Sequence, residues 1–193
     1  GSFLLTVDGE VFLSDLGCGE YTREYFHPET RYEILCNRSL GHNVPIVNGC
    51  EQQAGREFSS EYFTSICMGK VELSFAGAYE KDASWKLKRV VESYEEEECL
   101  MITDYVFGEE IYFVKERLIT QKEPVLLNDK ILLSGEKGHV EISISEDIHK
   151  VEVEKTSFRN HRGKDEDVWL ITIPVSLNTR NGNCQICCKY IEK

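Results

Sequence analysis

An alternation of apolar and polar side chains with a period of two residues runs through most of this chain. This is the pattern of a strand with one buried face. The alternation is clearest at residues 71–75, 140–144, 151–153 and 169–175. Short runs rich in β-forming residues, at 111–114 and 131–133, add further strand signals. No amphipathic helix longer than three turns competes with them, so the sequence predicts an all-β fold.

Two dipeptides mark tight turns between apolar runs. Asp8-Gly9 follows the apolar run at 3–7, and Asn48-Gly49 follows the run at 44–47. An Asx-Gly pair favours the type I′ turn of a two-residue β-hairpin, because both central residues adopt positive φ there. We therefore expect a hairpin at each of these positions.

The spacing of strands and turns indicates a large antiparallel β-sandwich of two stacked sheets. No Gly/Ser-rich or Pro-rich linker interrupts residues 1–193, which we interpret as a single domain. Pro174 lies inside a strand-like run and suggests an edge strand or a bulge. The charged stretch 159–167 is interpreted as one long exposed loop. The acidic stretch 95–98 could open a helix, but we favour a solvated loop.

The charge balance excludes several classes of partner. Among 193 residues, 34 are acidic and 22 are Lys or Arg, which gives a formal net charge of −12. Binding to nucleic acid or to an anionic membrane needs clustered basic side chains, so neither is expected as a partner. The 41% hydrophobic content is too high for a disordered acidic chain. The chain opens on Gly1-Ser2-Phe3 inside an apolar segment, and we expect it to be cut from a longer protein.

Eight cysteines are spread without the regular spacing of a disulfide scaffold. Cys184 and Cys187 form a lone CxxC, and no second ligand pair for a structural zinc site lies nearby. Cys184, Ile186 and Cys188 share parity, so on a strand they point to one face and act as small buried hydrophobes. Reduced thiols favour a cytoplasmic location, while a secreted or periplasmic one stays open.

The segment 15–53 concentrates residues suited to a functional site. Asp15 stands at a strand end, and His42 precedes a strand. The two are 27 residues apart (42 − 15), so no local motif joins them, although neighbouring strands can bring them together. Tyr21 and Arg31 lie between them, and the planar guanidinium of Arg31 suits a substrate carboxylate.

Several short elements of this segment occur in the order found in one family. Gly1-Ser2-Phe3 opens the pattern, and Asp15-Leu16-Gly17 forms a turn after an extended strand. Gly41-His42-Asn43 follows, and then Asn48-Gly49 and Gln52. This arrangement resembles the C-terminal β-sandwich domain of the heparinase II/III-like polysaccharide lyases. The specific match covers about the first quarter of the chain.

The resemblance implies a function for the longer protein. Family members cleave uronate-containing polysaccharides, glycosaminoglycans among them, by β-elimination. An N-terminal α-helical toroid carries most catalytic side chains, and the β-sandwich walls the substrate cleft. We accordingly assign no catalytic residue to this chain. The acidic polysaccharide and the toroid of the same protein are the expected partners.

The resemblance also implies zinc as a cofactor. The family's zinc site uses a His from a His-x-His pair, the Asp of the turn and a later His. The last two correspond to Asp15 and His42, whereas the His-x-His pair is absent from this sequence. At best, then, this chain holds two protein ligands of a site that needs at least three.

Simpler roles compete with each of these assignments. His42 can be a strand-entry residue bonded to backbone, and Asp15 can cap an Asx turn before Gly17. Tyr21 faces either a sugar cleft or the sandwich interior. Arg31 meets either a substrate carboxylate or an acidic neighbour on the surface. The alternative for the chain as a whole is a non-catalytic carbohydrate-binding or structural β-sandwich, which would usually expose an aromatic platform.

Overall fold

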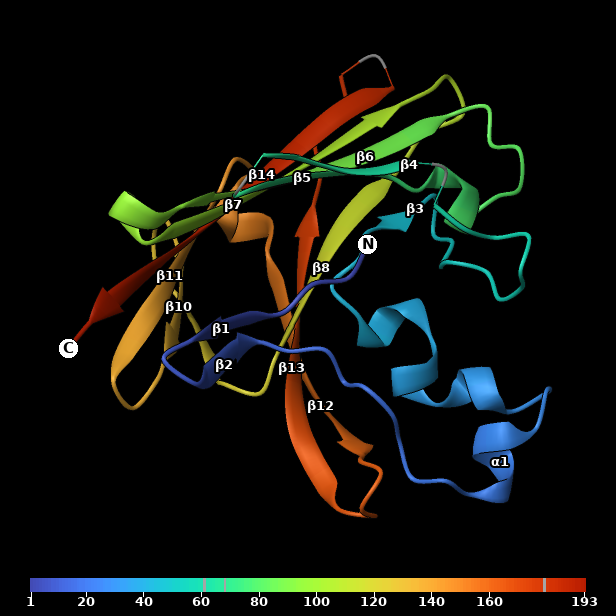
Figure 1. The fold of residues 1–193 in the computed structure, drawn as a ribbon, viewed down its shortest axis with the longest axis horizontal. Coiled ribbons are helices and arrows are strands. Elements are labelled where there is room, and N and C mark those ends of the chain that lie inside the picture. Colours follow the sequence, from blue (N-terminus) through green and yellow to red (C-terminus); the bar gives the residue numbers. More distant parts are fainter. Residues whose placement is uncertain (61, 68, 179) are drawn as a thin grey trace.

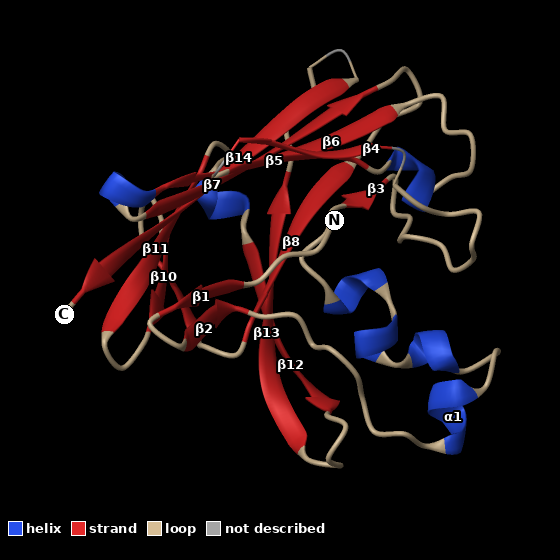
Figure 2. Cartoon of the chain, viewed as in Figure 1, coloured by secondary structure: helices blue, strands red, loops and turns tan. Residues whose placement is uncertain are grey.

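The computed structural model of the protein describes residues 1–60, 62–67, 69–178 and 180–193. An eight-stranded and a four-stranded sheet, both antiparallel, enclose the main apolar core, and a two-stranded hairpin packs beside them (Figures 1 and 2). The predicted all-β sandwich is confirmed.

The larger sheet has the strand order β4-β5-β6-β7-β14-β11-β10-β9. Its strands are β4 (Tyr62–Cys67), β5 (Lys70–Ser74), β6 (Lys86–Tyr94), β7 (Cys99–Phe107), β9 (Pro124–Leu126), β10 (Ile131–Ser134), β11 (Gly138–Ile144) and β14 (Asn181–Glu192). The last strand of the chain, β14, lies between β7 and β11 and joins the two halves of the sheet.

The smaller sheet has the order β12-β13-β8-β3, and the hairpin is formed by β1 and β2. Their bounds are β1 (Leu5–Val7), β2 (Glu10–Leu13), β3 (Ile46–Val47), β8 (Val114–Thr120), β12 (Glu152–Arg159) and β13 (Asp165–Pro174). Phe12 and Leu13 of the hairpin are fully buried in the same core as the inner faces of the two large sheets. The hairpin therefore completes the sandwich.

The hairpin expected at Asp8-Gly9 is confirmed. Its φ angles are 51° and 82°, and β1 pairs with β2 across it. The turn at Asn48-Gly49 is also present, with φ of 52° and 77°. Only an isolated bridge between Val47 and Cys50 follows it, because β3 pairs with β8 instead.

Three further expectations need correction. Pro174 ends β13, which is a central strand, so the edge-strand interpretation was wrong. Proline is tolerated there because the pairing of β12 begins opposite Thr172, two residues before it. The stretch 159–167 is not one long loop, because its ends belong to β12 and β13 and only residues 160–164 form the turn between them. In the run 111–114 only Val114 is in a strand.

Residues 14–44 form an irregular cover over the smaller sheet (Figure 1). This cover contains α1 (Arg23–Phe26) and three 3₁₀ turns, η1 (Arg31–Glu33), η2 (Leu35–Asn37) and η3 (Ser39–Gly41). Beneath it lies a second apolar cluster made of Leu16, Cys36, Ile119, Phe158, Val168 and Leu170. Leu118 belongs to the main core and Ile119 to this cluster, so the cover packs on the outer face of the smaller sheet.

The other helical turns are also short. They are η4 (Ala76–Ala78), η5 (Glu95–Glu97) and η6 (Ile148–Lys150). The acidic stretch thus forms one exposed 3₁₀ turn between β6 and β7. Within the described part of the chain, no helix has the length and apolarity needed to cross a membrane.

A buried ionic network connects the two large sheets with the N-terminal residues. Arg89 on β6 donates two hydrogen bonds to Asp104 on β7 and lies 3.4 Å from Glu116 on β8. All three side chains are at most 3% exposed. The Nη1 atom of Arg89 also donates to the carbonyl oxygens of Gly1 and Asn43, at 2.6 and 2.7 Å. One guanidinium therefore links both sheets to the N-terminal residues and to the segment that carries His42.

Glu116 gives this network a dependence on pH. Burial, and then the neighbouring Asp104 carboxylate, raise the pKa of Glu116 well above its ordinary value, and Arg89 only partly offsets them. The folded protein holds this proton at a pH where the unfolded chain has released it. Stability is therefore lost as pH rises from about 4.5 towards the raised pKa.

Glu116→Gln should remove this loss, because a glutamine carries no proton to release. We expect the variant to match the wild type near pH 4 and to unfold at a higher temperature than the wild type at pH 8. Thermal unfolding of both proteins across this range is the measurement. If the variant is less stable than the wild type at pH 8, the ionised form of Glu116 stabilises the folded protein and the prediction is wrong.

Candidate functional site

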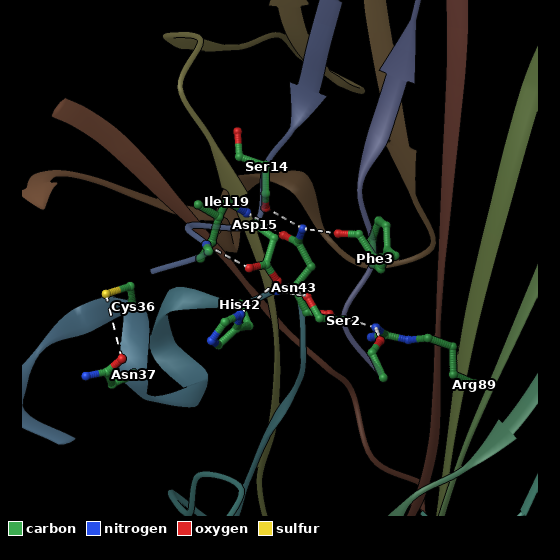
Figure 3. A network of polar contacts seen from close by, with 12 residues as sticks. Ser2, Phe3, Ser14, Asp15, Cys36, Asn37, His42, Asn43, Arg89 and Ile119 are labelled. Carbon is green, nitrogen blue, oxygen red and sulfur yellow. Dashed lines mark hydrogen bonds and ion pairs between the residues drawn. The ribbon is translucent and has the colours of Figure 1, made fainter. Parts of the chain in front are cut away.

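Asp15 and His42 meet at the junction between the hairpin, the irregular cover and the smaller sheet (Figure 3). Their Oδ2 and Nδ1 atoms are 2.8 Å apart, and both side chains are about one-quarter exposed. Asp15 follows β2, and His42 follows the turn η3. The structure thus brings together two residues that are distant in sequence.

Asp15 is held as an anion by its hydrogen bonds. Burial raises its pKa, but hydrogen bonds from His42, the Gly17 amide and the Ser2 hydroxyl outweigh burial and lower the pKa of Asp15 to about 2. An ionised carboxylate accepts only, so the Nδ1 atom of His42 is the donor of this pair. The second ring nitrogen of His42 points away from Asp15 (Figure 3).

The Asx turn expected at Asp15 is present as well. The Gly17 amide donates to Oδ1 of Asp15 at 3.0 Å, while Oδ2 faces His42. Gly17 has a φ of 64°, which favours glycine at this position of the turn. The two roles weighed for Asp15, a turn cap and a partner of His42, are therefore compatible.

Asn43 fixes the backbone next to His42. Its fully buried side chain donates to the carbonyls of Phe3 and Ser14 and accepts from the Ile119 amide, at 2.7–2.8 Å. The Ser2 hydroxyl donates to Asp15 and accepts from the Asn43 amide. These bonds join β8 and both ends of the hairpin to His42, so the pair is set on rigid elements.

His42 and Arg31 line the same hollow, which has a volume of about 680 Å³. Tyr32 and Gln52 also contribute to its wall. In the described part of the chain, no carboxylate forms an ion pair with Arg31, whereas the neighbouring Arg38 is paired with Glu51. The surface salt bridge weighed for Arg31 is thus not formed among the described residues. Its guanidinium lies over the Tyr32 ring, 5.1 Å from the ring centroid, and both residues line this hollow together with His42.

Asp15 borders a second hollow of about 490 Å³, whose lining includes His161 and Arg162. Tyr21 contributes to neither hollow. It is 65% exposed and packs against Tyr25 and Phe26, with ring centroids 5.1 and 5.2 Å apart. The structure therefore groups Asp15, His42 and Arg31 and leaves Tyr21 on a separate aromatic cluster.

The residues present fit part of a zinc site. Two atoms bound to one tetrahedral zinc ion at about 2.0–2.1 Å lie roughly 3.3 Å apart. For Asp15 Oδ2 and His42 Nδ1 to bind one ion, Nδ1 would release its proton and the two atoms would separate by about half an ångström. Among the described residues, no group of three or more His, Cys, Asp or Glu side chains is placed to hold a metal. Two ligand positions are thus provided for, and a complete site is not.

Comparison with known proteins points to the same family of folds as the sequence motifs. No family model matches the sequence, and no curated protein matches it. Solved structures do match: a heparinase III gene product aligns over 100% of this chain with a TM-score of 0.75 and 15% identity. The heparan sulfate lyase HepC from Pedobacter heparinus aligns over 100% with a TM-score of 0.70 and 12% identity. This chain has a heparinase III domain fold.

The resemblance inferred from the motifs is thus confirmed at the level of the fold. Another heparinase III structure aligns with a TM-score of 0.65 and 14% identity. The chain spans about 30% of the length of these heparinase III and HepC structures. The fold therefore corresponds to one part of each of these longer structures.

Two residues of the site were not singled out from the sequence. Ser2 and Asn43 were noted only as parts of motifs, although they hold Asp15 and the backbone at His42. A buried asparagine that satisfies three main-chain groups has no local sequence signal. Its position directly after His42 was the only available indication.

Proposed function

We propose that this chain is the β-sandwich domain of a polysaccharide lyase that cleaves uronate-containing chains by β-elimination. In this role the domain walls the substrate cleft and contributes ligands to a zinc site. The observation that carries the proposal is the Asp15–His42 pair beside a hollow lined by His42 and by Arg31, which forms no ion pair within the described part of the chain. The fold shared with heparinase III and with HepC supports it.

Arg31 is proposed to bind the substrate's carboxylate. In β-elimination, a base removes the proton next to the uronate carboxylate, and neutralising that carboxylate makes the removal easier. The planar guanidinium donates two parallel hydrogen bonds to a carboxylate. The proton-removing base and the acid that protonates the leaving oxygen are assigned to the toroid domain.

Asp15 and His42 are proposed as two ligands of the zinc site, with the remaining ligands from another part of the longer protein. Ser2 contacts Asp15, and Gly1 contacts Arg89, so the first residues of this chain run directly beside the pair. When bound, zinc would supply a fixed positive charge at this junction. The Gly17 and Ser2 hydrogen bonds would hold the Asp15 carboxylate in the orientation that binding needs.

Tyr21 remains a second candidate for substrate contact, through its exposed aromatic cluster. Tyr21, Tyr25 and Phe26 are tilted against each other, with interplanar angles of 44–74°. Such rings present edges as well as faces to a passing sugar chain. We propose for this cluster a weaker contact with the polysaccharide than for Arg31.

His42→Ala tests the site in the full-length protein. We expect zinc affinity to fall at least about tenfold, because a ligand is lost, and the release of unsaturated uronate product to slow. His149→Ala is the matched control, since His149 is exposed and far along the chain from the pair. Zinc content after dialysis against a weak chelator and ultraviolet absorbance of the product are the two measurements.

The two measurements separate the parts of the proposal. Equal zinc content in wild type, Asp15→Ala and His42→Ala would refute the ligand assignment and leave the lyase assignment standing. Absence of unsaturated product from every uronate polysaccharide tested, heparan sulfate included, would refute the lyase assignment.

The alternative is a non-catalytic carbohydrate-binding module, and the exposed Tyr21 cluster is the observation that favours it. The tryptophans do not add to it. Trp85 is 5% exposed, and the ring of Trp169 is covered by Lys155 at 5.1 Å. Glycan-array binding that Tyr21→Ala abolishes, in a full-length protein without lyase activity, would establish this alternative.

A further inference from the structure

Cys99 and Cys187 form a contact that the proposed function does not use. Cys99 begins β7, and Cys187 lies on β14, the neighbouring antiparallel strand. In the register of these strands Cys99 faces Lys189, and Cys187 faces Met101, so the two cysteines are diagonal neighbours. Diagonal neighbours of this kind point to the same face of the sheet.

The two sulfur atoms are 2.7 Å apart. A disulfide bond is about 2.0 Å long, so the pair is within about 0.7 Å of bonding distance. No second pair of sulfur atoms comes this close among the seven cysteines whose side chains the structure describes. The two side chains are thus already directed toward each other across the strands.

Exposure to solvent also makes this pair more accessible to an oxidant than the neighbouring cysteines. Cys99 and Cys187 are both partly exposed, on the outer face of the larger sheet. Cys184 and Cys188 lie on the same strand as Cys187 but point to its other face. Both are buried in the main core, as their shared parity predicted. A reagent in solution therefore reaches Cys187 and does not reach the two buried thiols.

We propose that Cys99 and Cys187 form a disulfide that joins β7 to β14. The oxidant is a small-molecule disulfide such as oxidised glutathione. The Cys187 thiolate, its proton released to solvent, attacks one sulfur of the small disulfide and expels one thiolate. The Cys99 thiolate, its proton likewise released, then attacks the Cys187 sulfur and expels the second. Two protein thiols are oxidised, and one small disulfide is reduced to two thiols.

The order of attack follows from the surroundings of Cys99. Burial and the neighbouring Cys187 raise the pKa of the Cys99 thiol to about 12. Cys99 is therefore mostly protonated at neutral pH and suits the second step, in which its target sulfur is already adjacent. The resulting bond would close a loop of 88 residues between strands at the centre of the larger sheet.

The test is oxidation of the chain with oxidised glutathione, followed by peptide mapping and thermal unfolding. We expect a loss of two hydrogens, a crosslinked peptide pair containing Cys99 and Cys187, and a rise in Tm of roughly 5–15 °C that dithiothreitol reverses. Cys99→Ser and Cys187→Ser should each abolish the crosslink. Cys188→Ala is the matched control, because it removes the adjacent thiol and should retain the crosslink.

Peptide mapping of the wild type needs no variant, so the test stands even where a substitution impairs folding. Recovery of Cys99 and Cys187 as free thiols under conditions that modify the exposed Cys50 would overturn the proposal. So would their recovery as separate glutathione adducts, or a crosslink that persists in Cys187→Ser and is lost in Cys188→Ala.

Discussion

Replacing Arg89 with methionine is expected to lower the free energy of unfolding by about 3–5 kcal/mol. The substitution keeps most of the side-chain volume and removes the charge. It leaves the Asp104 carboxylate buried without its partner, and it removes the donor to the carbonyls of Gly1 and Asn43. An unpaired charge in an interior costs more than the original pair contributed.

Thermal unfolding is the measurement, and a fall in Tm of roughly 6–20 °C corresponds to this loss. Arg159→Met is the control. Arg159 is also bonded to two carboxylates, those of Glu20 and Asp165, but its side chain is 53% exposed. Exposed pairs contribute about 0–1 kcal/mol, so the control should change Tm by only a few degrees. Equal effects of the two substitutions would mean that burial of the Arg89 network does not matter.

The buried network could have been found from the strand pattern. Arg89 shares parity with Leu87, Asp104 with Ile102 and Val106, and Glu116 with Val114 and Leu118. Each charged side chain therefore occupies an apolar-face position of its own strand. A single such residue would suggest a break in the strand. Three of them, with one positive charge among them, indicate a buried cluster.

Local turns and strand periodicity were predictable because they depend on neighbouring residues. The turn at Asp8-Gly9 is one example, since Asx-Gly chemistry fixes its backbone angles. Sheet order was not predictable in this way. The placement of β14 between β7 and β11 depends on pairing between strands that are far apart in sequence.

The candidate site was predictable only in part, for the same reason. Asp15 and His42 lie 27 residues apart, so strand pairing left their meeting open and only a family resemblance favoured it. The irregular cover between them has no helical or strand period, because it is shaped by packing on the second apolar cluster. The charge of Arg31 was visible in the sequence, but only the structure showed that no acidic side chain among the described residues pairs with it.

Asn43→Leu should have the second large effect, a loss of about 3–6 kcal/mol in the free energy of unfolding. Leucine has nearly the same volume but cannot bond to Phe3, Ser14 or Ile119. Each buried main-chain group left without a partner costs about 1–3 kcal/mol. Because these bonds fix the backbone at His42, the variant that still folds should also bind zinc more weakly in the full-length protein.

Asn37→Leu is the control for that substitution, since the amide of Asn37 donates one hydrogen bond, to the Arg31 carbonyl, at a partly exposed position. It should cost about 1 kcal/mol and leave zinc affinity unchanged. Denaturant unfolding gives the free energies, and zinc titration gives the affinities. If Asn43→Leu lowers stability and leaves zinc affinity at the wild-type value, Asn43 supports the hairpin and does not position His42. If stability is also unchanged, the three buried groups find other partners and the rigid setting inferred for the Asp15–His42 pair is wrong.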